Sequence, residues 1–306
     1  RAAQALLQRH PNLRAAFVHH DLPTPVQAVP RDAALPWRAI ALEGSAEARH
    51  AALDALLRED RAQGFDLAHG PLLRFTLVRE HERLHQLVLT NHHIVFDGWS
   101  LPILLEELFA LYANGGDIDA LPRVAPYRDY LAWLSGRDRG AAQQAWRDYL
   151  DGVDEATRVA GSASAGARTE VLTHSLPEAL SCQLGHQARR LGLTLNTLTQ
   201  AAWALLLSRI TGRDDVVFGT TVSGRPPELA GIERMVGLFI NTVPVRVRLQ
   251  PQQSLESLLH TVQAEQSALL EHQHLSLPEV QKLAGVGELF DTLTVFENYP
   301  IDETAF

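Results

Sequence analysis

The sequence predicts an α/β protein with two lobes of similar helix-and-sheet type. In both halves, apolar residues at helical spacing alternate with short apolar runs typical of strands. Between the halves, residues 151–169 lose this periodicity and are rich in Gly, Ser and Ala, as linkers are. A chain of 306 residues can bury two ordinary cores. We therefore expect an N-terminal lobe over residues 1–155, a linker over 156–169, a C-terminal lobe over 170–306, and a site between the lobes.

Cap and turn residues mark the expected elements of the first half. Ser45 can cap a long helix, and the polar turn His81-Glu82-Arg83 joins two apolar runs into a hairpin. The expected helices cover about residues 2–10, 46–63, 101–113, 127–134 and 141–150. The expected strands cover residues 15–19, 26–29, 71–80 and 84–92.

The second half repeats this kind of alternation. Pro177 can open a helix, because proline is tolerated in the first helical turn. The helix expected over 194–210 is so apolar that we expect it to be buried rather than to lie on a surface. The other expected helices cover residues 177–191 and 254–272. The expected strands cover residues 170–175, 216–222, 235–249 and 292–296, with a loop at 224–229.

Bulk composition excludes several classes of protein. Hydrophobic residues make up 46% and charged residues 21%, as in ordinary globular proteins. The net charge is −9 with no basic stripe, which argues against nucleic acid and anionic membrane as partners. No apolar run approaches the roughly 20 residues that span a bilayer. The single cysteine, Cys182, cannot form an internal disulfide, so we expect a cytoplasmic protein in which Cys182 only fills space.

The most informative stretch is residues 91–100, Asn-His-His-Ile-Val-Phe-Asp-Gly-Trp-Ser. It lies between an expected strand and an expected helix, where loops often present reactive side chains. His92 and His93 are poor ligands for one metal ion, because neighbouring residues on a strand point to opposite faces. One histidine can instead be structural while the other moves a proton. Asp97, if buried, needs a cationic partner, and the Gly98 N–H can face a developing oxyanion.

Several further segments, in order along the chain, resemble one known family. The chain resembles a condensation domain of a nonribosomal peptide synthetase, within the chloramphenicol-acetyltransferase-like superfamily. Pro11 and His274 depart from the Glu and Asp that are usual there. Besides the double-histidine stretch, the resemblance rests on residues 9–14 (Arg-His-Pro-Asn-Leu-Arg), 127–133 (Tyr-Arg-Asp-Tyr-Leu-Ala-Trp), 236–242 (Val-Gly-Leu-Phe-Ile-Asn-Thr) with Arg246, 272–279 (His-Gln-His-Leu-Ser-Leu-Pro-Glu) and 290–300.

The resemblance implies a fold and a reaction. The fold would be two α+β two-layer sandwiches, the acetyltransferase-like lobes, in a V with a central tunnel, truncated here at both ends. A donor thioester and an acceptor amine would arrive on phosphopantetheine arms of upstream and downstream peptidyl carrier proteins. The amine would attack the thioester to form an amide, with no directly bound cofactor and no metal. An adenylation domain would lie next to it in the same polypeptide.

The resemblance also implies roles for individual residues. His93 would be catalytic and His92 structural. Asp97 would form an ion pair with Arg225 as the first choice of partner and Arg14 as the second. Gly98 would line the site near the donor carbonyl. Trp99 and Asn241 are candidates for the tunnel wall, although Trp99 and Ser100 are also expected to pack against the following helix, and Asn241 can equally bond its own backbone.

Some alternatives stay open at this level. His93 can act as a general base or can position the amine, since an α-amine with a pKa near 8 is partly deprotonated at neutral pH. Epimerisation domains share the double-histidine motif, but residues 238–244 favour condensation, and the loop at 224–228 favours an L-configured donor and acceptor. Two other functions remain: a catalytically silent recruitment module and a coenzyme A-dependent acyltransferase.

Overall fold

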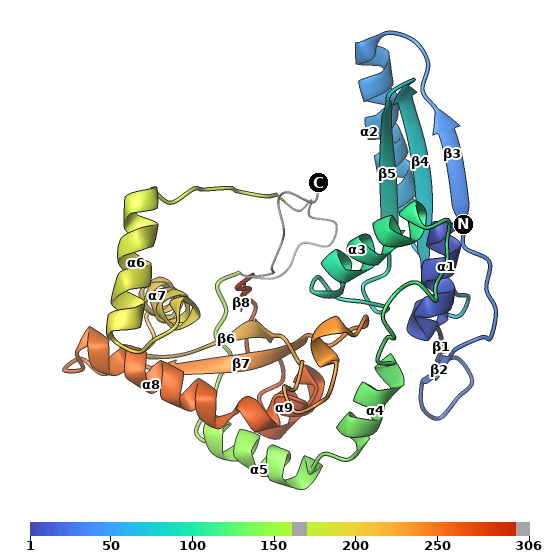
Figure 1. The fold of residues 1–306 in the computed structure, drawn as a ribbon. Coiled ribbons are helices and arrows are strands. Elements are labelled where there is room, and N and C mark those ends of the chain that lie inside the picture. Colours follow the sequence, from blue (N-terminus) through green and yellow to red (C-terminus); the bar gives the residue numbers. More distant parts are fainter. Residues whose placement is uncertain (161–169, 298–306) are drawn as a thin grey trace. The chain divides into compact units, whose positions relative to one another are not determined.

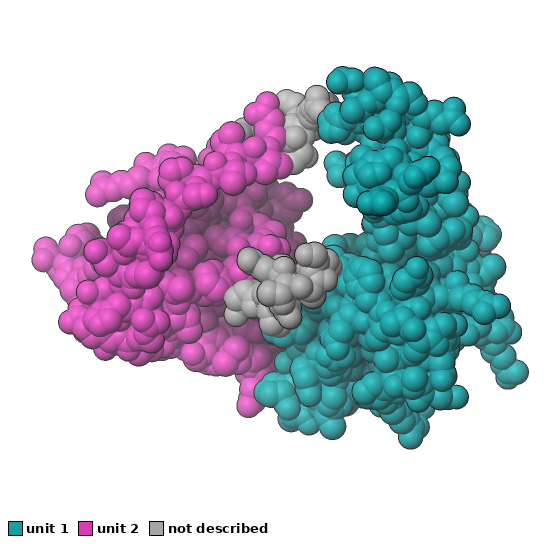
Figure 2. Space-filling model, turned by 45° about the horizontal axis from the view of Figure 1, so that its top comes forward, with its two compact units in different colours: residues 1–136, 225–239, 299–306 teal, residues 137–224, 240–298 magenta. Residues whose placement is uncertain are grey.

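The computed structural model describes residues 1–160 and 170–297. The chain forms two compact units, coloured separately in Figure 2. Among the described residues, unit 1 contains Arg1–Gly136 and Arg225–Phe239, and unit 2 contains the remainder. The segment Arg225–Phe239 thus belongs to unit 1 although it lies far along the chain. Most of the linker expected at 156–169 lies outside the described residues, and the V of two lobes with its tunnel stays a prediction.

Unit 1 contains a three-stranded sheet in the order β3-β4-β5 (Figure 1). Its strands are β3 (Trp37–Ala41), β4 (Leu73–His81) and β5 (Leu84–Asn91). The expected hairpin of β4 and β5 is confirmed, and β3 pairs with β4 in parallel. Helix α2 (Ala46–Gln63), capped by Ser45, covers one face, where Asp60 accepts hydrogen bonds from Arg74 of β4 and Thr90 of β5. Strands β1 (Ala16–Val18) and β2 (Val26–Ala28) form a separate antiparallel pair.

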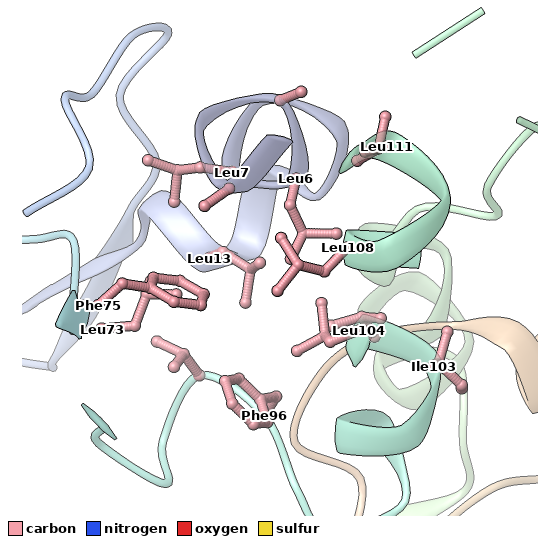
Figure 3. Close-up of a cluster of buried hydrophobic side chains, with 14 of the residues drawn as sticks. Leu6, Leu7, Leu13, Leu73, Phe75, Phe96, Ile103, Leu104, Leu108 and Leu111 are labelled. Carbon is pink, nitrogen blue, oxygen red and sulfur yellow. The ribbon is translucent and has the colours of Figure 1, made fainter. Parts of the chain in front are cut away.

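Leucine side chains from three helical segments fill the main core of unit 1. These segments are α1 (Ala2–Arg9), the 3₁₀ turn η1 (Pro11–Arg14) and α3 (Ser100–Ala113). Leu7, Leu13 and Leu104 are at most 2% exposed, and Figure 3 shows how they meet Phe75 and Phe96. A burial of this extent stabilises by about 1.5–3 kcal/mol per large apolar side chain. The core therefore holds α1 and α3 beside the end of the sheet.

A second, smaller cluster holds Arg225–Phe239 against α4 (Tyr127–Ser135). Tyr130 of α4 contacts Phe239 edge-on, with 4.7 Å between ring centroids. Ile232, in the 3₁₀ turn η2 (Ile232–Arg234), and Met235 are buried in the same cluster. This packing brings a segment from the second half of the sequence next to the end of the double-histidine loop.

Unit 2 contains a sheet in the order β7-β6-β8, with helices on both faces (Figure 1). Alternate residues of β6 face opposite sides: Val216 and Phe218 pack with α7 and α8, and Val217 packs with α5 and α9. The strands are β6 (Asp215–Val222), β7 (Asn241–Arg248) and β8 (Leu293–Thr294). The helices are α5 (Arg139–Leu150), α6 (Glu178–Arg190), α7 (Leu195–Thr211), α8 (Leu255–Ala268), the 3₁₀ turn η3 (Leu270–His272) and α9 (Leu277–Ala284).

Some expected elements are wrong or displaced. Residues 170–175 form no strand, and the strand region expected at 235–249 becomes a strand only from Asn241. Helix α7 is not buried all round, because Leu206 and Ile210 are 48% and 52% exposed. The expectation from the sequence missed β3 and α9. None of the described helices is long and apolar enough to cross a membrane.

Candidate functional site

The double-histidine loop begins where β5 ends. The N–H of His92 donates to the Leu72 carbonyl at 2.9 Å, which continues the sheet by one residue. The N–H of Ile94 donates to Nδ1 of His92 at 3.1 Å. A ring nitrogen that accepts from a backbone N–H carries no hydrogen itself, so this contact fixes the ring's tautomer and orientation. The geometry suits a structural His92, as the sequence led us to expect.

His93 differs sharply from its neighbour. Its side chain is exposed, and it lies in the turn that follows the strand. Among the described residues, its ring makes no hydrogen bond or ion pair, so both nitrogens are available to a ligand. The structure therefore presents the predicted catalytic imidazole on a surface while it anchors the preceding one.

Asp97 ends the loop and is the most buried carboxylate of the site. Its side chain has no exposed surface. Oδ1 accepts from the Ser100 N–H at 3.0 Å and from Arg225 Nη2 at 3.3 Å, and Oδ2 accepts from the Phe239 N–H at 3.0 Å. A buried carboxylate that lacked these donors would cost several kcal/mol. The structure thus brings together Asp97 and Arg225, the partner preferred from the sequence.

Arg225 is itself nearly enclosed. Its Nη1 donates to the carbonyls of Ile232 and Met235 at 2.5 and 3.0 Å, and its guanidinium lies 3.9 Å from the centre of the Phe239 ring. Burial lowers the pKa of this guanidinium, and the charge of Asp97 opposes that shift. Arginine remains protonated at any physiological pH, so the guanidinium keeps its positive charge beside Asp97.

The second choice, Arg14 as the partner of Asp97, is a wrong prediction. Its guanidinium donates to the carbonyls of Leu7, Gln8 and Pro30. It therefore holds the end of α1 and the chain after β2. Two neighbours of Arg14 in the sequence, Arg9 and His10, bind a different buried carboxylate, that of Glu107.

Gly237 brings the backbone of Arg225–Phe239 against the loop. Its carbonyl accepts from the Asp97 N–H at 3.0 Å. A Cβ on Gly237 would lie 2.2 Å from Cδ2 of Tyr127, so only glycine fits there. The Tyr127 hydroxyl donates to the Leu238 carbonyl at 2.6 Å, and burial raises the pKa of this hydroxyl, which keeps it a donor. The expectation from the sequence gave no role to Gly237 or Tyr127.

The remaining predicted residues lie in different surroundings. Gly98 and Trp99 follow Asp97 in the turn before α3, and Trp99 packs partly buried against the unit 1 core. Asn241 starts β7 in unit 2, and its amide donates to the carbonyls of Gln273 and Leu275 at 2.8 and 2.6 Å. These contacts hold the turn before α9. A place for Trp99 or Asn241 in a tunnel wall stays a prediction.

Metal ligands are not gathered at this loop. Within residues 1–160 and 170–297, no group of three or more His, Cys, Asp or Glu side chains could hold a metal ion. Among the described residues, this loop offers the chemistry of one exposed imidazole, and its far end is held by the buried pair of Asp97 and Arg225.

Comparisons with known proteins agree on one family. A family model described as the condensation domain matches residues 1–305. Bacitracin synthase 3 of Bacillus licheniformis is 37% identical over 310 residues, which cover 98% of this chain and 5% of that protein. Chondramide synthase cmdD of Chondromyces crocatus is 40% identical over 309 residues, 98% of this chain and 8% of that protein. The chain thus spans a small part of these relatives.

Solved structures show the same fold. The first condensation domain of the calcium-dependent antibiotic synthetase, in complex with a substrate analogue, has a TM-score of 0.74 at 23% identity, covering 97% of this chain and 72% of that chain. The X-domain from teicoplanin biosynthesis has a TM-score of 0.77 at 23% identity, covering 95% and 68%. The predicted fold class, mixed helix and sheet of the chloramphenicol-acetyltransferase type, is confirmed. The chain belongs to the condensation-domain family of nonribosomal peptide synthetases.

Proposed function

We propose that this domain forms an amide bond between two carrier-bound substrates. The nitrogen of an acceptor aminoacyl group attacks the carbonyl carbon of a donor thioester. A C–N bond forms, the C–S bond breaks, and the proton lost by the amine ends on the released thiol. Two observations support this proposal: family membership over residues 1–305, and a loop in which His93 is exposed while Asp97 is buried and paired with Arg225.

His93 is the group that we propose for the reacting centre. A neutral imidazole can accept a hydrogen bond from the amine and can take up its proton, a role typically worth about 10²–10⁴ in rate. Holding the two carrier-bound reactants together in the right orientation also raises the rate. The N–H of Gly98, which directly follows the buried Asp97, is the proposed neighbour of the donor carbonyl.

The partners in this proposal are upstream and downstream peptidyl carrier proteins and an adjacent adenylation domain. The phosphopantetheine arms belong to the carriers, so the domain itself holds no cofactor. The Gly224-Arg225-Pro226-Pro227-Glu228 loop and the Leu-Pro that follows Ser100 resemble the subtype that joins an L-configured donor to an L-configured acceptor.

Intact-mass spectrometry of the acceptor carrier tests the proposal. The whole protein that contains this chain is mixed with a panel of L-aminoacyl donor carriers, the matching D-aminoacyl donors, or acetyl-coenzyme A, each with a panel of L-aminoacyl-loaded acceptor carriers. We expect the acceptor to gain one residue from L-donors, less from D-donors, and nothing from coenzyme A. Carrier binding without any transfer would identify a silent recruitment module. Transfer from acetyl-coenzyme A alone would identify a coenzyme A-dependent acyltransferase.

A further inference from the structure

Ser100 is the first residue of α3 and has no exposed surface. Its Oγ lies 2.9 Å from Asp97 Oδ1, 3.0 Å from Arg225 Nη2, and 2.9 and 3.1 Å from the carbonyl oxygen and the nitrogen of Gly237. A serine hydroxyl can donate one hydrogen and accept two. The Gly237 N–H and Arg225 Nη2 use both lone pairs, and the hydroxyl hydrogen goes to Asp97 or the Gly237 carbonyl. The hydrogen-bonding capacity of this hydroxyl is fully used.

We propose that Ser100 is a positioning residue for the reaction at His93, an inference that rests on the proposed function. Its hydroxyl joins the end of the double-histidine loop to the segment Arg225–Phe239 at a point where both backbones are buried. Asp97 and Ser100 lie on either side of Gly98, and His93 lies in the same short loop. Loss of the hydroxyl therefore removes one hydrogen-bond partner from Arg225 and one from the Gly237 N–H, and it loosens the contact that holds the loop against this segment.

Two simpler roles do not account for this geometry. A serine nucleophile needs an exposed oxygen with a free lone pair, and Ser100 has neither. A residue that only fills space at the start of a helix needs no polar partners, yet this hydroxyl has four polar atoms around it. Removing it leaves the Gly237 N–H without an acceptor in a buried place, which an alanine cannot repair.

Steady-state kinetics of Ser100→Ala in the whole protein test the proposal. With loaded donor and acceptor carriers, we expect kcat to fall by about 10²-fold, as misplacement by roughly 1 Å can do, and KM for either carrier to stay nearly unchanged. The matched control is Ser254→Ala. Ser254 caps α8 in unit 2, where its Oγ accepts from the Ser257 N–H at 3.2 Å, so the control loses a serine hydroxyl at a helix start far along the chain from the loop. We expect its kcat to equal that of the wild type.

A double-variant cycle tests whether Ser100 acts through Asp97. Because Ser100 is proposed to act through Asp97, Ser100→Ala should add little to the loss caused by Asp97→Asn, since residues in one network are not additive. If the fold-losses in kcat of the two single variants multiply in the double variant, the proposal is overturned. A wild-type kcat for Ser100→Ala would overturn it as well.

If Ser100→Ala does not fold, Ser100→Cys replaces it in the same assay. The thiol is similar in shape but a weak donor and acceptor, so we again expect a lower kcat at an unchanged KM. A wild-type kcat for Ser100→Cys would overturn the positioning role. In each case the wild type is measured alongside: product from the wild type with normal variants rejects only this inference, whereas no product from the wild type rejects the proposed function.

Discussion

Replacing Asp97 with alanine is expected to destabilise unit 1 strongly. The substitution removes the acceptor of the Ser100 N–H, the Phe239 N–H and Arg225 Nη2, all of which are buried. It also leaves the Arg225 guanidinium, only 6% exposed, without its carboxylate. The chain cannot rehydrate these groups without opening the contact between the loop and Arg225–Phe239.

The size of the effect follows from the ion pair. Breaking a buried pair by removing one partner costs about 3–5 kcal/mol. A typical domain has only about 5–15 kcal/mol of stability in total. We therefore expect the free energy of opening of unit 1 to fall by about 3–5 kcal/mol, which is a rise of about 10²-fold to 4 × 10³-fold in the population of opened forms.

Amide hydrogen exchange followed by mass spectrometry measures this effect in each unit separately. Peptides of unit 1 that cover the loop and Arg225–Phe239 should lose protection in Asp97→Ala, and peptides from β6 and β7 of unit 2 should keep theirs. Asp97→Asn is the matched control, because it keeps the shape and one acceptor oxygen and should lose less protection. Unchanged protection with lost activity would refute this reasoning and would give Asp97 a chemical role.

Two other substitutions test neighbouring parts of unit 1. Gly237→Ala places a Cβ 2.2 Å from the Tyr127 ring, so we expect the free energy of opening of unit 1 to fall by about 1–3 kcal/mol in the same exchange measurement. Tyr127→Leu in the same chain should restore part of this loss. Full exchange protection in Gly237→Ala alone would contradict the packing. Burial alone raises the pKa of Glu107, but hydrogen bonds and charges from His10 and Arg9 lower it more, to below its usual 4.5. A carboxyl with a lowered pKa stabilises the folded state above that usual value, and this stability is lost as the pH falls through the lowered pKa. The stability difference between the wild type and Glu107→Gln should therefore shrink below pH 4.5 in acid unfolding curves, and a difference that grows there would contradict the assignment.

Periodicity and caps predicted the helices well where both signals coincide. The helix expected at 46–63 has the bounds of α2, with Ser45 accepting from the Ala48 N–H at 3.3 Å. The missed helix α9 also had a signal: Ser276 and Glu279 have capping-box spacing, and Pro278 lies in the first turn. Strand β3 had no such sequence signal. It is a mostly exposed edge strand, so its sequence lacks the alternation of buried and exposed residues by which a strand is predicted.

The strand expected at 170–175 failed for a different reason. A short run of mixed polar and apolar residues forms a strand only if a neighbouring strand pairs with it. We expected helix α7 to be buried all round because its composition is strongly apolar. Composition alone does not show which face of a helix the rest of the protein covers. Its Leu207 is fully buried, whereas Leu206 is half exposed.

The site shows the same division between local and distant information. Asp97 needed a cation by elementary electrostatics, and the resemblance pointed to Arg225. The roles of Ser100 and Gly237 arise from a contact between residues 137 positions apart, which a single sequence does not reveal. Tyr127 likewise gains its role from the distant Leu238 carbonyl.

The rate of a single acyl transfer tests the central claim most directly, namely that His93 acts at the reacting centre on a loop stabilised from behind. In rapid-quench experiments with pre-loaded donor and acceptor carriers, His93→Ala should slow dipeptide formation by about 10²–10⁴-fold, with exchange protection of unit 1 unchanged. Dipeptide formation at the wild-type rate in this variant would contradict the account.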